Sequence, residues 1–196
     1  MSIRIEHLSK AFDGKKVLEN FSCELPEQGV IALMGRSGIG KSTLINLLLG
    51  LRKPDSGKII LPHGLKFSVV FQEDRLIEHM SARDNLLLTT GRGKEEIDKV
   101  LAALSLNPEE TASVKTYSGG MKRRVSLARG ILYKADVLLL DEPFRGLDAQ
   151  TREQAMELVK NCWRGRLVLL VTHDEQEARS MGAERIMIIG GSADEQ

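Results

Sequence analysis

Apolar runs that contain no polar residue recur along the chain. Such runs are typical of strands buried on both faces of a sheet, and they occur at VIALM (30–34), VLLL (137–140) and LVLLV (167–171). KFSVVFQ (66–72) and RIMIIG (185–190) predict two further strands. Each run is too short for a helix of ordinary length, so a strand is the better prediction in every case.

Five other stretches repeat their apolar residues every three or four positions, as amphipathic helices do. STLINLLLG (42–50) and DAQTREQAMELVKN (148–161) alternate with the buried strands. SARDNLLLTT (81–90), KEEIDKVLAAL (94–104) and GGMKRRVSLARGIL (119–132) follow one another with no strand between them. The alternation predicts an α/β fold with a mainly parallel central sheet, and the consecutive helices predict an inserted α-helical subdomain at about 74–134.

The N-terminal segment has a different pattern, with apolar and polar residues alternating in IRIEHL (3–8) and VLENFSCEL (17–25). Asp13-Gly14 lies between them as a turn, so the pattern predicts an antiparallel hairpin. KPDSGKIIL (53–61) is a Pro/Gly turn that leads into another short strand. The 196 residues suit one domain, so we expect a single domain, 1–196, with an N-terminal antiparallel β-subdomain.

Composition narrows the class of partner. The chain is 42% apolar and 28% charged, which is ordinary for a globular protein, and its net charge of +1 and aromatic share of 4% argue against nucleic-acid binding. Cys23 and Cys162 lack metal-ligand spacing and are predicted to be buried thiols in a reducing compartment. Neither a signal-peptide pattern nor a bilayer-spanning run is present, so we expect a cytoplasmic protein that reaches the membrane only through another chain.

A glycine-rich segment, GRSGIGKST (35–43), joins a predicted buried strand to a predicted helix. It fits the pattern G-x-x-x-x-G-K-[ST], in which backbone N–H groups and the positive end of the helix contact phosphate oxygens. Lys41 is predicted to reach the β- and γ-phosphates of a nucleotide, and the Ser42 hydroxyl to ligate Mg²⁺. The residues predicted to bind nucleotide here are Gly35, Ser37, Gly38, Gly40, Lys41, Ser42 and Thr43.

Two acidic residues, Asp141 and Glu142, follow the apolar run VLLL. Ligands of parallel sheets bind at the carboxyl ends of strands, so Asp141 is expected to hold Mg²⁺, directly or through water. Glu142 is expected to accept a proton from the attacking water or to polarise it. Acidic residues at a strand end are also often merely solvated, and the phosphate-binding loop is what favours the catalytic interpretation.

Five segments occur along the chain in a recognisable order: GRSGIGKST, FQED (71–74), YSGGMKRRVSLARGIL (117–132), VLLLDEPFRGLD (137–148) and LVTHD (170–174). Together they resemble the ATPase subunit of an ABC transporter over essentially the whole chain. SGG distinguishes that family among P-loop proteins, and neighbouring details are most similar to importer ATPases of the nitrate, sulfonate and taurine type. The resemblance implies a P-loop NTPase fold that uses ATP and Mg²⁺ and couples ATP hydrolysis to transmembrane transport.

The resemblance also implies roles for single residues. Gln72 would contact Mg²⁺ and the attacking water, and His173 would contact the γ-phosphate and share in catalysis with Glu142. Asp148 would bridge two subunits near the nucleotide, and it also fits the N-cap of the following helix. Phe12 would stack on adenine where the family more usually has Tyr; a packing role in the hairpin is the alternative.

The SGG segment is implied to form a second phosphate site, through Ser118, Gly119 and Gly120. Ser118 is a typical N-cap residue. The resemblance implies that this segment contacts ATP held by the other subunit of a dimer, so that two subunits share each nucleotide. The basic residues 122–124 oppose the helix dipole, a conflict that an incoming anion would relieve; a solvated basic face is the alternative.

The partners implied by the resemblance are a second copy or a paired ATPase subunit, integral-membrane permease chains and, through them, a solute-binding protein. The ATPase would sit on the inner face of the cell membrane. Residues 73–90, including Leu76 and Met80, are expected to dock the permease, with packing inside the helical subdomain as the alternative. The sequence does not name the solute.

Competing functions explain less of the sequence. A non-transport ABC ATPase acting on a macromolecule such as DNA or ribosomes would commonly carry a long coiled coil or a second cassette, and neither is present. A P-loop kinase or GTPase would leave SGG unexplained. Met121, Tyr117 and Arg145 depart from the residues commoner in the family, and the end of the chain at Gln196 predicts that no C-terminal regulatory domain follows.

Overall fold

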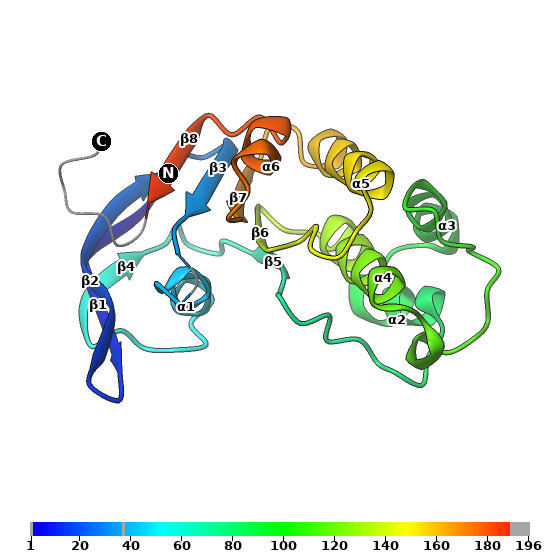
Figure 1. The fold of residues 1–196 in the computed structure, drawn as a ribbon, viewed down its shortest axis with the longest axis horizontal. Coiled ribbons are helices and arrows are strands. Elements are labelled where there is room, and N and C mark those ends of the chain that lie inside the picture. The colour runs from blue at the N-terminus through cyan, green and yellow to red at the C-terminus, as the bar shows by residue number, and fades with distance from the viewer. Residues whose placement is uncertain (1, 37, 189–196) are drawn as a thin grey trace.

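The computed structural model describes residues 2–36 and 38–188, and its main sheet is parallel throughout (Figure 1). The strand order is β5-β6-β7-β3-β8, and every neighbouring pair is parallel. The strands are β3 (Gly29–Met34), β5 (Phe67–Val70), β6 (Val137–Asp141), β7 (Leu167–Val171) and β8 (Arg185–Ile188). This confirms the predicted parallel sheet; residues 189–190 of RIMIIG lie outside the described residues.

The N-terminal strands form a separate antiparallel sheet in the order β2-β1-β4. Its strands are β1 (Ile3–Phe12), β2 (Lys15–Leu25) and β4 (Ser56–Ile60). The turn between β1 and β2 is Asp13-Gly14, and both residues have positive φ, 49° and 78°, as a tight two-residue hairpin turn requires. The predicted antiparallel β-subdomain is therefore confirmed.

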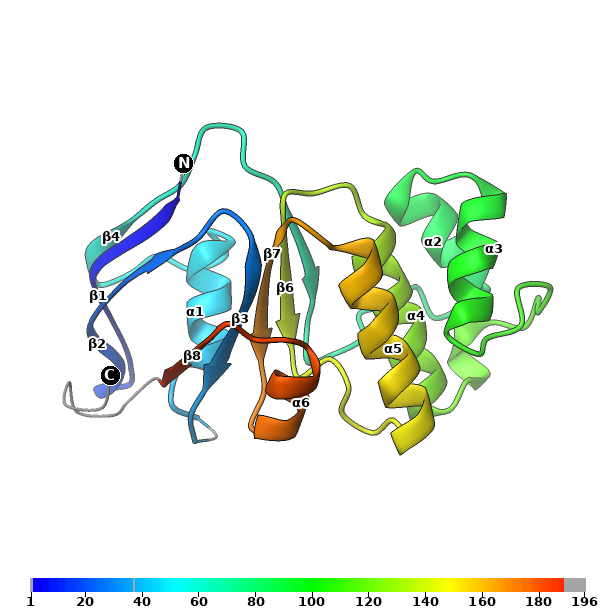
Figure 2. The same ribbon diagram turned by 90° about the horizontal axis from the view of Figure 1, so that it is seen from above.

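Helices cover both faces of the parallel sheet. They are α1 (Lys41–Leu48), α2 (Ala82–Thr90), α3 (Lys94–Ala103), α4 (Gly119–Leu132), α5 (Ala149–Cys162) and α6 (Glu175–Ser180), with a 3₁₀ turn at Val114–Thr116. Figure 2 shows α1 between the antiparallel sheet and one face of the parallel sheet, with α4 and α5 across the opposite face and α2 and α3 beyond them. The order of layers places α1 and α4 on opposite sides of the sheet.

Alternate side chains of the buried strands belong to two separate hydrophobic cores, one on each face of the sheet. In β6, Val137 and Leu139 belong to the core that contains α1 and the antiparallel sheet. Leu138 and Leu140 belong to the core that contains the helices α2 to α5. A strand apolar at every position is what this arrangement requires, because both of its faces are covered.

The helix α4 packs against both the sheet and the helices α2 and α3. It lies close to the sheet at Gly130, where an added Cβ atom would clash with the Val70 side chain at 2.4 Å. The Ser68 hydroxyl donates a hydrogen bond of 2.8 Å to the Gly130 carbonyl at the same point. The C-terminal half of α4 therefore packs directly on the sheet, although in the sequence α4 is the last of the consecutive helices.

The two cysteines, Cys23 in β2 and Cys162 at the end of α5, are free thiols. They pack against different cores and are partly buried. Burial raises the pKa of the Cys23 thiol to about 11 and also raises the pKa of the Cys162 thiol. Both thiols are protonated near neutral pH, which agrees with the predicted packing role.

Candidate functional site

A cavity of about 250 Å³ lies at the carboxyl edge of the parallel sheet. Three segments far apart in sequence meet in it: the loop before α1, the segment after β5 and the end of β6. The carboxyl edge is where parallel α/β sheets bind ligands. Its lining consists of Gly38, Gly40, Lys41, Ser42, Thr43, Gln72, Asp141 and Glu142.

The loop before α1 is shaped by glycine and closed by Lys41. Gly40 has a φ of 112°, and an added Cβ atom there would lie 2.4 Å from the Val17 carbonyl oxygen, so only glycine fits. The buried Lys41 ammonium donates to the carbonyls of Gly35 (2.7 Å) and Arg36 (3.0 Å). Among the described residues, no side chain caps the first turn of α1, so its N–H groups can point at an anion.

One residue of the predicted phosphate loop, Ser37, lies outside the described residues. Gly35 has a φ of 143°, and Gly38 a φ of 78°. Ser42 and Thr43 occupy the first turn of α1 and line the cavity. The loop therefore brings the other predicted phosphate-binding residues to one place.

Asp141 ends β6 at the cavity and is only 4% exposed. Burial is the main cause that raises the pKa of this carboxyl above its usual value, while a hydrogen bond from Ser42 and the charges of Arg123 and Lys41 act in the opposite direction. Mg²⁺ prefers oxygen ligands, and Ser42, Gln72 and Asp141 present oxygen atoms to the same cavity. These residues fit a magnesium ion that binds together with a nucleotide.

We expect Asp141→Asn to stabilise the protein, because it removes a carboxyl whose ionised form is disfavoured by burial. The folded state holds the Asp141 proton more tightly than the unfolded chain, so its ionisation costs stability as pH rises through the raised pKa. The gain in melting temperature should thus be larger at pH 8 than at pH 4, which thermal unfolding would measure. A lower melting temperature for the variant at pH 8 would contradict this account.

Glu142 follows Asp141 in a left-handed backbone conformation, with a φ of 47°. Its N–H donates to the Val171 carbonyl at 2.9 Å, which fixes the turn against β7. One carboxylate oxygen lies 3.7 Å from His173 Nδ1 and the other lies 3.4 Å from Arg145 Nη1. The two residues predicted to be catalytic are therefore neighbours, with the His173 side chain largely exposed.

The cavity of about 250 Å³ that contains the phosphate loop is called the phosphate cavity below. Phe12 lies at the end of β1 and does not line it. Its ring is partly exposed, with Arg52 at 5.0 Å and Lys10 at 5.6 Å from the ring centroid. Asp55 holds Lys10 in an ion pair and also accepts a hydrogen bond from the Ala11 N–H. The predicted adenine contact of Phe12 stays a prediction.

Ser118 caps the N-terminus of α4, as predicted, and its hydroxyl accepts a hydrogen bond of 3.2 Å from the Met121 N–H. Ser118 and Gly119 are exposed, and Gly120 is half-buried. None of the three lines the phosphate cavity. Because α4 and α1 lie on opposite faces of the sheet, the SGG segment is not part of its own chain's phosphate site.

The side chains of the basic residues 122–124 have partners within the chain. The interpretation that they leave a site for an incoming anion was therefore wrong. Arg123 is buried and donates to backbone carbonyls of the loops around the cavity. Arg124 donates to the carbonyls of Leu104 and Ser105, and the Lys122 ammonium lies 4.0 Å from the Glu78 carboxylate. Periodicity did not reveal these tertiary acceptors, which compensate for the unfavourable helix dipole.

Asp148 is the N-cap of α5, where its carboxylate accepts hydrogen bonds from the Thr151 N–H (2.9 Å) and hydroxyl (2.7 Å). These bonds hold the pKa of the exposed Asp148 carboxyl below its usual value. The predicted N-cap role is therefore confirmed. Its predicted contact with a second subunit stays a prediction.

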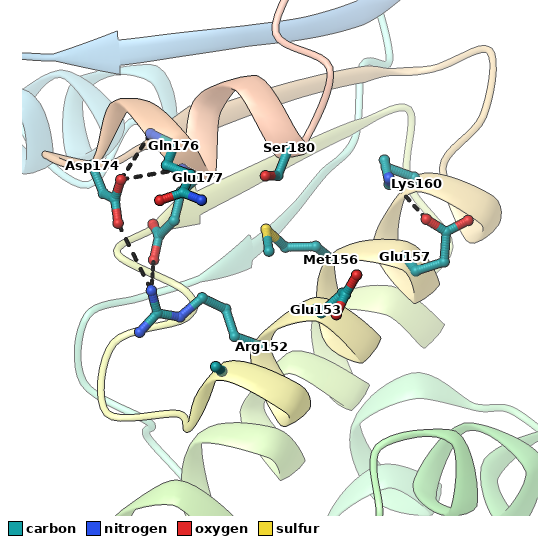
Figure 3. A pocket seen from close by; sticks show the side chains of 10 residues that line it. Arg152, Glu153, Met156, Glu157, Lys160, Asp174, Gln176, Glu177 and Ser180 are labelled. Atoms are coloured by element: carbon teal, nitrogen blue, oxygen red, sulfur yellow. Dashed lines mark hydrogen bonds and ion pairs between the residues drawn. The ribbon is translucent and has the colours of Figure 1, made fainter.

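A larger cavity of about 540 Å³ lies between α5 and α6 (Figure 3). Arg152 of α5 lies 3.8 Å from the carboxylates of both Asp174 and Glu177, and Glu177 also accepts a hydrogen bond from the Thr172 hydroxyl. Carboxylates outnumber cations in the lining, which disfavours a phosphate ligand. Sequence reasoning did not find this contact, which ties the helix capped by Asp148 to the segment that carries His173.

Comparisons with known proteins agree with this geometry. The profile of the family described as ABC transporter matches residues 18–145. The chain is 39% identical over 192 residues to the aliphatic sulfonates import ATP-binding protein SsuB 1 of Streptomyces avermitilis, covering 96% of this chain and 73% of that protein. It is 36% identical to the proteins of the same name in Shouchella clausii and Rhizobium johnstonii, covering 96% of this chain in each case and 77% and 73% of those proteins.

Nothing in these comparisons supports an ATPase that acts on a macromolecule instead of a transported solute. Within residues 2–36 and 38–188, no helix has the length and apolar character that crossing a bilayer requires. The family match and the cavity with its phosphate loop and acidic pair lead to one conclusion. The chain belongs to the ABC transporter family, as an ATP-binding subunit that hydrolyses ATP to drive transport.

Proposed function

We propose that this chain works as one half of an ATPase dimer that powers an importer for sulfonate-like organic anions through separate permease chains on the inner face of the membrane. The observation that carries the dimer is the separation of two phosphate-binding elements. The loop before α1 and the SGG segment at the start of α4 belong to opposite faces of one sheet. Two copies, or this chain and a paired ATPase subunit, would complete each other's nucleotide sites.

The cavity residues would bind different parts of the nucleotide and its metal ion. Lys41 would leave its two loop carbonyls for the β- and γ-phosphates, and the free N–H groups of α1 would hold the same phosphates. Ser42, Gln72 and Asp141 would hold Mg²⁺, which neutralises charge that develops on the phosphates when it is bound. Phe12 would stack on the adenine ring.

Hydrolysis would depend on Glu142 and on the second subunit. Glu142 projects into the cavity beside Asp141 and would accept the proton of the attacking water. His173, 3.7 Å from that carboxylate, would contact the γ-phosphate. Ser118, Gly119 and Gly120 of the second subunit would close over the γ-phosphate, with Asp148 at the contact between subunits.

The proposed permease surface lies at the open edge of the sheet, beside β5. A groove of about 220 Å³ there is lined by Phe67, Ser68, Val69, Thr89, Arg129, Gly130 and Tyr133. Next to Thr89, Leu88 of α2 is 65% exposed, and Leu87 is exposed as well. Leu76, which the sequence suggested, packs against the helical core, so within 73–90 the exposed leucines of α2 are the better contact.

We expect Leu88→Asp to reduce association with the permease by about tenfold, because burying a charge in an apolar contact is unfavourable, while ATP binding stays within about twofold. Permease association would be measured by affinity purification of the tagged chain from detergent-solubilised membranes. Mass spectrometry would quantify the polytopic membrane proteins that co-purify with it. Leu51→Asp is a matched control, since Leu51 is 58% exposed just beyond α1, away from the groove. Equal recovery of polytopic chains with both variants would remove the proposed surface.

A further inference from the structure

The guanidinium of Arg123 joins two segments beside the cavity, residues 141–143 and 71–74, to the helix α4. Its Nε donates to the Pro143 carbonyl at 2.9 Å, and its Nη2 donates to the carbonyls of Asp141 (2.9 Å) and Glu142 (2.6 Å). Its Nη1 donates to the Phe71 carbonyl at 2.6 Å, with the Gln72 carbonyl and an Asp74 carboxylate oxygen each at 3.3 Å. All five N–H donors have an acceptor, and the residue is 4% exposed.

The contacts on the acidic side explain how Glu142 keeps its conformation. Non-glycine residues rarely adopt positive φ, and this one persists only where its surroundings hold it. Three successive carbonyls, of Asp141, Glu142 and Pro143, converge on the guanidinium. Arg123 therefore compensates for the turn that directs the Glu142 carboxylate into the cavity.

The contacts on the other side fix the segment that carries Gln72. This segment follows β5 and is not part of a strand, and Gln72 itself is exposed. The carbonyls of Phe71 and Gln72 are held by the same guanidinium that holds the Glu142 turn. The two segments cannot move apart without breaking charge-assisted hydrogen bonds to one side chain.

We propose that Arg123 is a positioning residue that couples the start of α4 to both Glu142 and Gln72. Arg123 lies five residues after Ser118, on the helix whose first turn would contact ATP in the second subunit. A displacement of α4 when the dimer closes would thus move the water-activating carboxylate and Gln72 together. The inference rests on the proposed role of Glu142 and adds to it the group that holds that residue in place.

The test compares Arg123→Met and Arg123→Lys with Arg166→Met in the full chain. Arg166 is a matched control, because it also donates to backbone carbonyls, those of Ala135 and Cys162. It lies just before β7 begins, at the amino ends of the strands and away from the cavity at their carboxyl ends. For Arg123→Met we expect kcat to fall about 10²-fold, as for a catalytic group displaced by about 1 Å, with KM and ATP affinity within about threefold. Arg166→Met should lower the melting temperature and leave kcat per folded molecule within about twofold.

Two further measurements separate positioning from stability. Arg123→Lys keeps the charge but has three donors on one atom, so it should restore the melting temperature more than kcat. Combined with Glu142→Gln, Arg123→Met should reduce turnover by clearly less than the product of the two single losses, because the part of its effect that acts through Glu142 is already lost. Equal kcat losses for Arg123→Met and Arg166→Met at equal folded fraction, or multiplicative losses in the double variant, would overturn the inference. Parent turnover for Glu142→Gln alone would instead contradict the proposed catalytic role.

Discussion

The Glu142→Gln variant is expected to bind ATP with parent affinity and to hydrolyse it about 10³-fold more slowly, within the range that a general base contributes. An amide keeps the size of the side chain but does not accept the proton of the attacking water. The phosphate loop, Lys41 and Ser42 are untouched, so the nucleotide still binds. Because the dimer that closes on ATP would open only after hydrolysis, the variant should accumulate as an ATP-dependent dimer.

The measurements are steady-state ATP turnover and light scattering after size exclusion, each with and without Mg²⁺-ATP. Glu153→Gln is a matched control, since Glu153 is an exposed glutamate on α5 outside the phosphate cavity. Its turnover and its monomer fraction should equal those of the parent. A Glu142→Gln variant that hydrolysed ATP at the parent rate would show that another group activates the water.

The parallel sheet could be predicted because a strand buried on both faces is apolar at nearly every position. VLLL and LVLLV have no polar position, and both became central strands with side chains in two cores. The end of β5 was less predictable: the segment KFSVVFQ predicts a strand that reaches Gln72, but the strand ends at Val70. There the chain leaves the sheet, and the carbonyls of Phe71 and Gln72 accept hydrogen bonds from Arg123.

The site was predictable where backbone chemistry dictates residue type, and not where distant segments meet. A phosphate loop needs glycine at positions such as Gly40, so its sequence pattern is specific. The role of Arg123 depends on carbonyls far along the chain, and every residue has a carbonyl, so no residue type marks the acceptors. Its spacing to Leu127 and Gly130, four and seven residues on, was a usable signal, since that stripe of α4 faces the sheet.

Two arginines, the buried Arg123 and the half-exposed Arg152, have a common consequence for movement within the subunit. Arg123 ties the helix that begins after Ser118 to Glu142 and Gln72, and Arg152 ties the helix capped by Asp148 to the segment around His173. Each predicted contact with a second subunit is thus linked through one arginine to a predicted catalytic residue. An arrangement of this type would keep the catalytic groups responsive to whether a partner is present.

Ser118→Arg is expected to reduce ATP hydrolysis by at least about 10²- to 10³-fold, because it removes a donor aimed at transition-state charge and also adds a long side chain at the contact between subunits. ATP binding by the monomer should stay within about twofold. Ser118 lies outside its own chain's phosphate cavity, so the longer side chain obstructs only a partner's nucleotide. Ser118→Ala separates this effect from the lost helix cap, which costs about 1 kcal/mol of stability. It should lower the melting temperature as much as Ser118→Arg does, but reduce turnover less.

Mixing Ser118→Arg with Lys41→Ala tests whether the site is shared between subunits. In a mixed dimer, the intact phosphate loop of one chain faces the intact SGG segment of the other, so one complete site forms from two inactive chains. Since half of the dimers would be mixed and each would hold one complete site, turnover should recover to about a quarter of the parent value. If the mixture stayed inactive and Ser118→Arg alone failed to bind ATP, the SGG segment would have to act on its own chain's nucleotide. The opposite faces that α1 and α4 occupy in this fold argue for recovery.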